Sequence, residues 1–362
     1  MSDAPPPGGK RRAWRYVSFA VSLLIVVGIF AFAIPRFAAY KDVWAAIRTL
    51  TPLETWSLVA ATIFNLFTYW WANMAALPGL TVGKAAVVTQ TTTSVANTLP
   101  AGGAIALGLT YTILRSWGFT GTAIALYIGV TGIWNIFAKL ALPVLSVAIL
   151  VLQGSNSAAF VAAALVGLAV LAVAVGLLAA TFRSERLARR IGDGLGAVIT
   201  ALKRPFHGAP VTDGGDRAVG FRSDTISLVE RRWFRLTWTT ILSQLALFFI
   251  LLLSLRHMGV SEQEVSTAQV FAVFSFGRLI SALPITPGGL GVIELGYIGG
   301  LVAAGGAKPQ VVAAVLLFRT LTFGIQIPLG GFTYLIWRGN KRWRTTPAQE
   351  EAVTQASPAA SG

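Results

Sequence analysis

Residues 122–152 read TAIALYIGVTGIWNIFAKLALPVLSVAILVL, a run in which Lys139 is the only charged side chain. A helix needs about 20 apolar residues to cross the roughly 30 Å hydrocarbon core of a bilayer, so this run is long enough to span a membrane. Further apolar blocks of similar length, the last of them broken, occur at 16–34, 53–77, 157–182, 236–255 and 309–337. The chain is therefore expected to be an all-α integral membrane protein with about six spans.

The composition supports a membrane location for the whole chain. Of its 362 residues, 55% are hydrophobic and 12% are charged, with a mean hydropathy of +0.69; an average soluble protein carries about 25% charged residues. The absence of cysteine excludes disulfides and thiolate metal sites. The two histidines, His207 and His257, lie far apart in predicted loops and give little basis for a metal site. No cofactor and no metal are expected.

The basic residues predict the orientation, because Lys and Arg concentrate on the cytoplasmic side of membrane proteins. Four precede the first span, eleven lie between Arg183 and Arg235, and four follow the last span. This pattern predicts an inner (cytoplasmic) membrane protein with disordered cytoplasmic tails at 1–15 and 338–362. The block at 16–34 is longer than the apolar core of a signal peptide, which favours an uncleaved span. The net charge of +15 is expected to be mainly a topology signal, with some attraction to anionic lipid and none to nucleic acid.

Two other apolar stretches, 84–115 and 266–306, are interrupted by proline and glycine. The interruptions read NTLPAGG at 97–103 and LPITPGG at 283–289. Each remaining half is about 11 to 18 residues long, which is short of a full crossing. We therefore expect two re-entrant helical hairpins, whose irregular backbone must be satisfied by protein or by a water-filled cavity. A simple kinked pair of short helices is the alternative.

The order of elements suggests an inverted duplication. Counted from a cytoplasmic N-terminus, the first hairpin opens toward the cytoplasm and the second opens outward. A shift of 186 positions superimposes four identical residues, pairing Gly102, Gly103, Leu109 and Tyr111 with Gly288, Gly289, Leu295 and Tyr297. We predict one repeat at 16–152 and a second at 157–337, which includes a basic cytoplasmic loop at 183–235. Inverted repeats with broken helices are typical of alternating-access transporters.

Four ionisable side chains fall inside apolar sequence, at Lys139, Arg278, Glu294 and Arg319. Each costs at least about 2.5 kcal/mol at the centre of a membrane helix, so they should face a cavity or one another. One alternative is a structural ion pair of Glu294 with Arg278 or Arg319, and Lys139 could instead snorkel to an interface. The excess of cations, together with helix N-termini at the Gly-Gly breaks, would suit a phosphate. Neutral hydrogen-bonding groups, whose alternative role is helix–helix contact, are added by Asn97, Asn135 and Gln326.

The segment PITPGGLGVIE at 284–294 resembles the signature of the lysylphosphatidylglycerol synthase transmembrane family, and 97–103 with Arg115 resembles the family's first proline-glycine motif. Over residues 16–338 this resemblance implies a flippase-like fold that moves a phospholipid or a polyprenyl-phosphate-linked sugar. By matching position it also implies functional roles for Arg278, Glu294 and Arg319. Gly103 is followed by Ala104, where the family often has glutamate, which leaves the headgroup preference open. The short tail after Trp337 leaves no room for an aminoacyl-transferase domain, so a stand-alone member is expected.

Two function classes remain open. The first is a translocase for an anionic phospholipid or a lipid-linked phosphate, and the second is a membrane enzyme of glycosyl or phosphate transfer with Glu294 as general base. No other acid lies at predicted membrane depth, which favours transport. Membrane lipids are the expected partners, and the oligomeric state is open. The candidate substrate-binding residues are Arg278, Glu294, Arg319, Lys139, Gly102, Gly103, Pro287, Gly288, Gly289 and Asn97.

Overall fold

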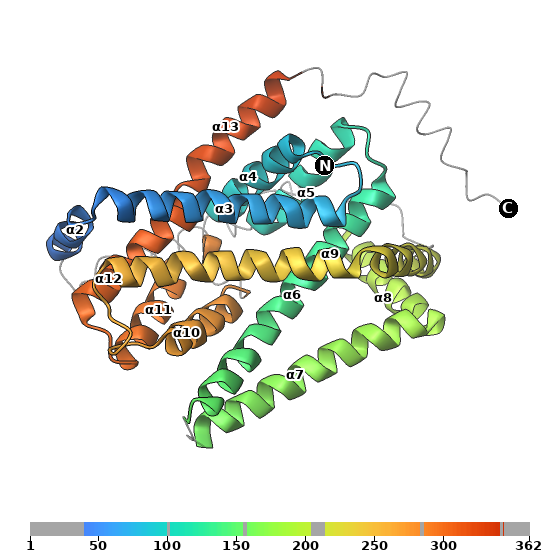
Figure 1. Cartoon of the computed structure of the whole chain (residues 1–362). Coiled ribbons are helices and arrows are strands. Elements are labelled where there is room, and N and C mark those ends of the chain that lie inside the picture. Colours follow the sequence, from blue (N-terminus) through green and yellow to red (C-terminus); the bar gives the residue numbers. More distant parts are fainter. Residues whose placement is uncertain are drawn as a thin grey trace, which may run out of the picture.

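The computed structural model of the chain describes residues 40–99, 102–154, 158–203, 214–282, 286–340 and 343. In these ranges every regular element is a helix, which confirms the predicted all-α class (Figure 1). The predicted first span at 16–34 and the N-terminal tail lie outside the described residues, as does most of the C-terminal tail.

In chain order the helices are α2 (Tyr40–Arg48), α3 (Pro52–Ala76), α4 (Val82–Thr98), α5 (Gly102–Ser116), α6 (Gly121–Leu152), α7 (Ala158–Arg183), α8 (Glu185–Lys203), α9 (Gly214–His257), α10 (Thr267–Ile280), the 3₁₀ turn η4 (Pro287–Gly289), α11 (Val292–Ala303), α12 (Lys308–Arg319), the π-helical turn η5 (Thr320–Gly324) and α13 (Gln326–Gly339).

Three stretches of the described chain are long and apolar enough to cross a membrane. They are α6, α9 and the continuous run Lys308–Gly339, which covers α12, η5 and α13. All three contain predicted blocks. The predicted blocks at 53–77 and 157–182 are also helical, as α3 and α7. Helix α3 contains Asn, Thr and Tyr side chains, which lower its mean hydropathy.

The region 183–235, expected to be a basic loop, is largely a helical hairpin. It is built from α8 and the N-terminal half of α9, which pack against each other. A Cβ on Gly192 would lie 2.3 Å from the carbonyl oxygen of Gly214, so the two backbones meet at a distance that only glycine allows. Arg189 forms a 2.5 Å ion pair with Asp216 across the hairpin. Gly192 and Gly214 therefore allow the two helices to pack closely.

Among helices that are not consecutive in the described chain, three pairs make the most extensive contacts. Helix α3 lies antiparallel to α9 (Figure 1), since Ser57 contacts His257 at one end and the Asn65 side chain donates to the carbonyl of Ser243 further along. Helix α4 packs on α13, and α6 packs on α10. These three pairs join the N-terminal helices to the C-terminal ones.

Both predicted interruptions are present, and each separates two short helices. The first pair, α4 and α5, has 17 and 15 residues, and the second, α10 and α11, has 14 and 12. A Cβ on Gly102 would lie 2.5 Å from the carbonyl oxygen of Val95, so α5 can start against the end of α4 only with glycine at that position. At the second break, Gly288, Gly289 and Gly291 all have positive φ, which glycine adopts without strain.

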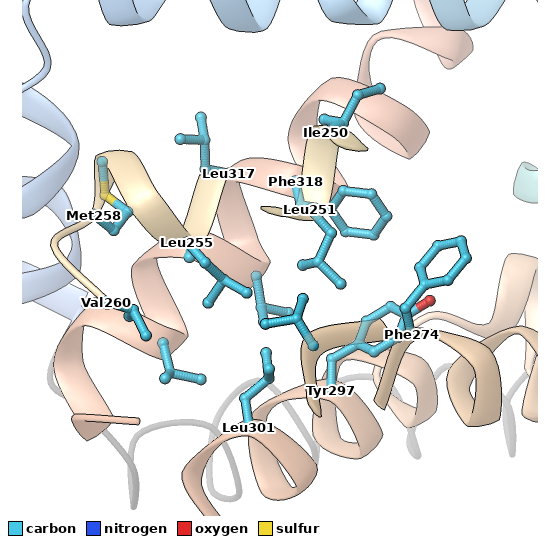
Figure 2. Packing of buried hydrophobic residues seen from close by; sticks show 14 of the residues in the cluster. Ile250, Leu251, Leu255, Met258, Val260, Phe274, Tyr297, Leu301, Leu317 and Phe318 are labelled. Carbon is cyan, nitrogen blue, oxygen red and sulfur yellow. The ribbon is translucent and has the colours of Figure 1, made fainter. Parts of the chain in front are cut away.

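Each pair of short helices is anchored by its own buried apolar cluster. The larger cluster joins α9, α10, α11 and α12 around Leu251, Phe274 and Leu301 (Figure 2). The second joins α3, α4, α5 and α6 around Val88 and Ile113. Because these clusters fix the two broken hairpins, the residues at the breaks are held in place.

Candidate functional site

A cavity of about 280 Å³ opens where the N-terminal helices, α3 to α6, meet the C-terminal helices, α9 to α13. Its wall takes residues from α3, α4, α6, α9, α10, α11, α12, α13 and both short turns. Three of the lining side chains are cations, Lys139, Arg278 and Arg319, and no carboxylate is among the lining residues of this described cavity. The remaining lining residues are Tyr69, Thr89, Gln90, Thr93, Asn97, Leu247, Ser281, Gly288, Ile293, Tyr297, Phe318, Thr322, Phe323 and Gln326.

Arg319, the last residue of α12, is held by three groups. Its Nε donates to Glu294 Oε1 at 2.6 Å, and its Nη2 donates to the carbonyl of Gly288 at 3.3 Å. Its guanidinium carbon lies 4.6 Å from the centroid of the Phe323 ring. Glu294 Oε2 in turn accepts from the backbone N–H of Gly291 at 2.7 Å, which caps the start of α11. The ion pair that the sequence left open is therefore the one with Arg319.

Glu294 does not itself line the cavity. Its side chain is 1% exposed, and both of its oxygens are engaged in the contacts above. The sequence also suggested that the helix N-terminus after the Gly-Gly break could bind a phosphate. In the structure, the carboxylate of Glu294, from the same helix, already caps this N-terminus. A phosphate at the N-terminus of α11 would therefore compete with the carboxylate of Glu294.

The other two cations have no carboxylate partner within the described residues. Arg278 on α10 donates from Nε to Oε1 of Gln244 on α9, at 2.9 Å. Gln244 orients the guanidinium without neutralising it, and its own Nε2 has no hydrogen-bond partner. Lys139 on α6 forms none of the ion pairs found in the described part of the chain. The cavity therefore retains positive charge beyond what Glu294 balances.

Half of the ten predicted site residues meet in this cavity, namely Asn97, Lys139, Arg278, Gly288 and Arg319. Gly102 is buried against the end of α4, and a Cβ on Gly103 would meet open space. Gly289 packs against Ile293. Gly102, Gly103, Pro287, Gly289 and Glu294 are absent from the lining, so they shape or support the site instead. Of the neutral candidates, Gln326 lines this cavity, whereas Asn135 lines a smaller one.

Several lining residues were not singled out by the sequence. Tyr69, Thr93 and Gln90 are uncharged polar residues within apolar helices, where such residues also serve ordinary helix–helix contacts. Gln244, which orients Arg278, was missed for the same reason. For Gln90 and Gln244, a glutamine in the middle of a helix is the local signal that could have marked them.

A comparison with protein families adds an independent observation. The family model described as "Lysylphosphatidylglycerol synthase TM region" matches residues 19–330. The chain belongs to this family. The match confirms the resemblance carried by the two proline-glycine motifs. A comparison with curated protein sequences gives no match.

Membership in the lysylphosphatidylglycerol synthase transmembrane family makes this chain a membrane protein and connects it with lipid handling. The matched range contains every residue that lines the cavity, from Tyr69 to Gln326. The cavity therefore belongs to the part of the chain that defines the family.

Proposed function

We propose that this protein is a flippase-like translocase, which moves an anionic phospholipid or a polyprenyl-phosphate-linked lipid across the cytoplasmic membrane by alternating access. The observation that carries the proposal is the cavity lined by Lys139, Arg278 and Arg319 without a lining carboxylate. The headgroup phosphate occupies this cavity while the acyl or prenyl chains stay in the bilayer.

The charge balance explains why the ligand is an anion. Unpaired cations inside a membrane protein are costly, and they are usually found where they pair or serve a substrate pathway. Arg278 and Lys139 have no carboxylate partner in the described chain, so a bound phosphate would supply the missing negative charge. Arginine and lysine bind phosphate oxygens through charge-assisted hydrogen bonds, which are stronger than neutral ones.

The pattern of helix packing supports an inverted duplication. Exchanging α3 with α9, α4 with α10, and α6 with the run from α12 to α13 leaves the contact of α3 with α9 unchanged. The same exchange converts the contact of α4 with α13 into that of α10 with α6. The short hairpins α4–α5 and α10–α11 also correspond. These relations favour two inverted halves with re-entrant hairpins and a substrate site between them, as in alternating-access transporters. Both termini are then cytoplasmic, as the basic residues predict.

The contacts of Glu294 favour transport over catalysis. A general base must reach the proton that it removes. Glu294 is instead bonded to Arg319 and to the Gly291 N–H, and lies behind the cavity wall. Its position suits the support of Arg319 better than proton abstraction.

The proposal can be tested in proteoliposomes that contain fluorescent anionic lipid. Wild-type protein should move the labelled lipid between leaflets, measured by its accessibility to a membrane-impermeant quencher. The double substitution Lys139→Gln with Arg278→Gln should reduce that movement at least tenfold without loss of folded protein. Arg189→Gln is the matched control, because this exposed arginine on α8 pairs with Asp216 on α9, away from the cavity.

Two results would contradict the translocase. If vesicles with wild-type protein move labelled lipid no faster than protein-free vesicles, the protein is not a translocase for that lipid. If the double variant moves lipid as fast as wild type, the three cations are not the substrate site. A new lipid product in mass spectra of the reconstituted membranes would support the enzyme instead.

A further inference from the structure

The last apolar run of the chain, Lys308–Gly339, is not one regular α-helix. Helix α12 ends at Arg319, and the next five residues form the π-helical turn η5. Here the N–H of Ile325 donates to the carbonyl of Thr320, five residues earlier, at 2.9 Å, so the turn holds one residue more than an α-helical turn. Such turns are rare, and inside α-helices they occur frequently at functional sites.

The helices on the two sides of η5 pack against different partners. Within the described residues, α12 packs on α9, α11 and α2, whereas α13 packs on α4. Figure 1 shows α13 leaving the group of α10, α11 and α12 in the direction of α4 and α5. The run therefore connects two separately packed groups of helices, and η5 is a link between them.

The backbone just after the turn is weakened as well. Pro328 has no N–H, so the carbonyl of Gly324 lacks the donor that an α-helix supplies four residues later. Proline and π-helical turns are both recognised causes of a sharp bend in a helix. Because both occur in this one short segment, it is the part of the run where bending requires the least disruption of the hydrogen-bond ladder.

The turn also lies on the wall of the cavity. Thr322 and Phe323 line it, and the Phe323 ring centroid is 4.6 Å from the guanidinium carbon of Arg319. A Cβ on Gly288 would lie 2.3 Å from the Phe323 ring and 3.2 Å from Oδ1 of Asn97, so the ring lies where the second proline-glycine break approaches the end of α4. A rearrangement of η5 would therefore move a side chain that contacts both Arg319 and this break.

We propose that η5 is a hinge, about which α13 and α4 bend relative to α12, and that the bend reshapes the cavity by moving Phe323 away from Arg319 and Gly288. The purpose of the hinge rests on the proposed function, since alternating access requires the two groups of helices to move. The bend itself can be measured without following any substrate.

Two spin labels placed on either side of η5 measure the bend. The chain contains no cysteine, so Lys308→Cys with Leu335→Cys introduces the only labelling sites, and both residues are exposed. In nanodiscs that contain phosphatidylglycerol, the distance between these labels should show two populations. Leu53→Cys with Trp71→Cys is the matched control, because both residues are exposed on α3, which has no such turn. This pair should show one population.

Deletion of Thr320 tests the wide turn. It removes the additional residue, so α12 and α13 can form one continuous α-helix while each keeps the face that it packs. The Thr320 side chain is exposed and is not part of the cavity wall. The deletion should leave one distance population and reduce lipid movement in proteoliposomes at least about tenfold. Thr320→Ala keeps the number of residues and should leave both measurements unchanged.

The outcomes separate the hinge from the proposed function. One distance population in labelled protein that still moves lipid would overturn the hinge, and this result does not depend on the folding of the deletion variant. Lipid movement at the wild-type rate after deletion of Thr320 would overturn it as well. Two populations in a protein that moves no lipid faster than protein-free vesicles would support the hinge and contradict the proposed function.

Discussion

The ion pair between Glu294 and Arg319 gives a quantitative prediction about stability. Glu294 is 1% exposed and Arg319 has 14% of its side chain exposed, with 2.6 Å between Oε1 and Nε. The substitution Glu294→Gln keeps the shape and the acceptor for the Gly291 N–H but removes the charge opposite Arg319. Breaking a buried pair from one side costs about 3–5 kcal/mol, because the remaining charge is buried and uncompensated.

The expected cost can be converted into a shift of the melting temperature. The entropy of unfolding is about 2.1 cal/mol/K per residue, so a loss of about 3 kcal/mol in a chain of this length lowers the melting temperature by about 4 °C. Arg319→Gln should cost a similar amount, since it leaves Glu294 unpaired. The double variant should be clearly less destabilised than the sum of the two, with a coupling of about 2 kcal/mol.

Thermal unfolding of the four proteins in detergent measures this cycle. Glu230→Gln provides the control, because this glutamate is exposed on α9 and its replacement should have little effect. Additive single effects would refute the reasoning, since they would mean that the two side chains do not depend on each other. Glu294→Gln should reduce lipid movement only in proportion to the amount of folded protein that is lost.

Three further predictions follow from other residues. Lys139→Gln should weaken the binding of an anionic lipid about tenfold while raising the melting temperature, because it removes a charge that has no ion pair in the described chain; a lower melting temperature would show that Lys139 is paired. Gly102→Ala should cost about 1–3 kcal/mol, because its Cβ would lie 2.5 Å from a backbone carbonyl oxygen of α4, whereas Gly103→Ala meets open space and should be tolerated in the same melting assay. In the turn after α9, hydrogen bonds from Thr267, with a nearby arginine, lower the pKa of Glu262 from its usual 4.5. A lowered carboxyl pKa stabilises the fold above pH 4.5 and this stability is lost as the pH falls below that value, so Glu262→Gln should be slightly less stable than wild type at pH 7, and this difference should shrink as the pH falls below 4.5.

The membrane fold could be predicted because its signals are local. The apolar run 122–152 is long enough to predict a membrane helix by itself, and the glycines at 288, 289 and 291 predict a break because glycine adopts positive φ without strain. The family could be predicted from the same proline-glycine segments. In contrast, the sequence left two partners open for Glu294, since the choice depends on how α12 packs, 25 residues further along.

The capping role of Glu294 could have been read from the sequence but was not. It stands three residues after Gly291, which is the spacing at which a glutamate side chain reaches back to the N-terminus of its own helix. In contrast, the neutral polar residues that line the cavity, Gln90 among them, could not be predicted from local sequence spacing. These residues are uncharged and lie on several helices, so only the packing of α3, α4 and α13 shows that they face one space.

The contact between α4 and α13 has a consequence for motion. A Cβ on Gly330 would lie 2.2 Å from the Cβ of Ser94, so the two helices touch at backbone distance, and hydrogen bonds of Thr91 with Thr333 and of Ser94 with the Ile327 carbonyl fasten them on either side. The corresponding contact of α6 with α10 is made by a small apolar cluster that includes Leu150 and Ala272. Apolar side chains slide past one another more readily than interlocked backbones. In the proposed translocase we therefore expect α4 and α13 to move as one rigid body, and the opening for a headgroup to form between α6 and α10.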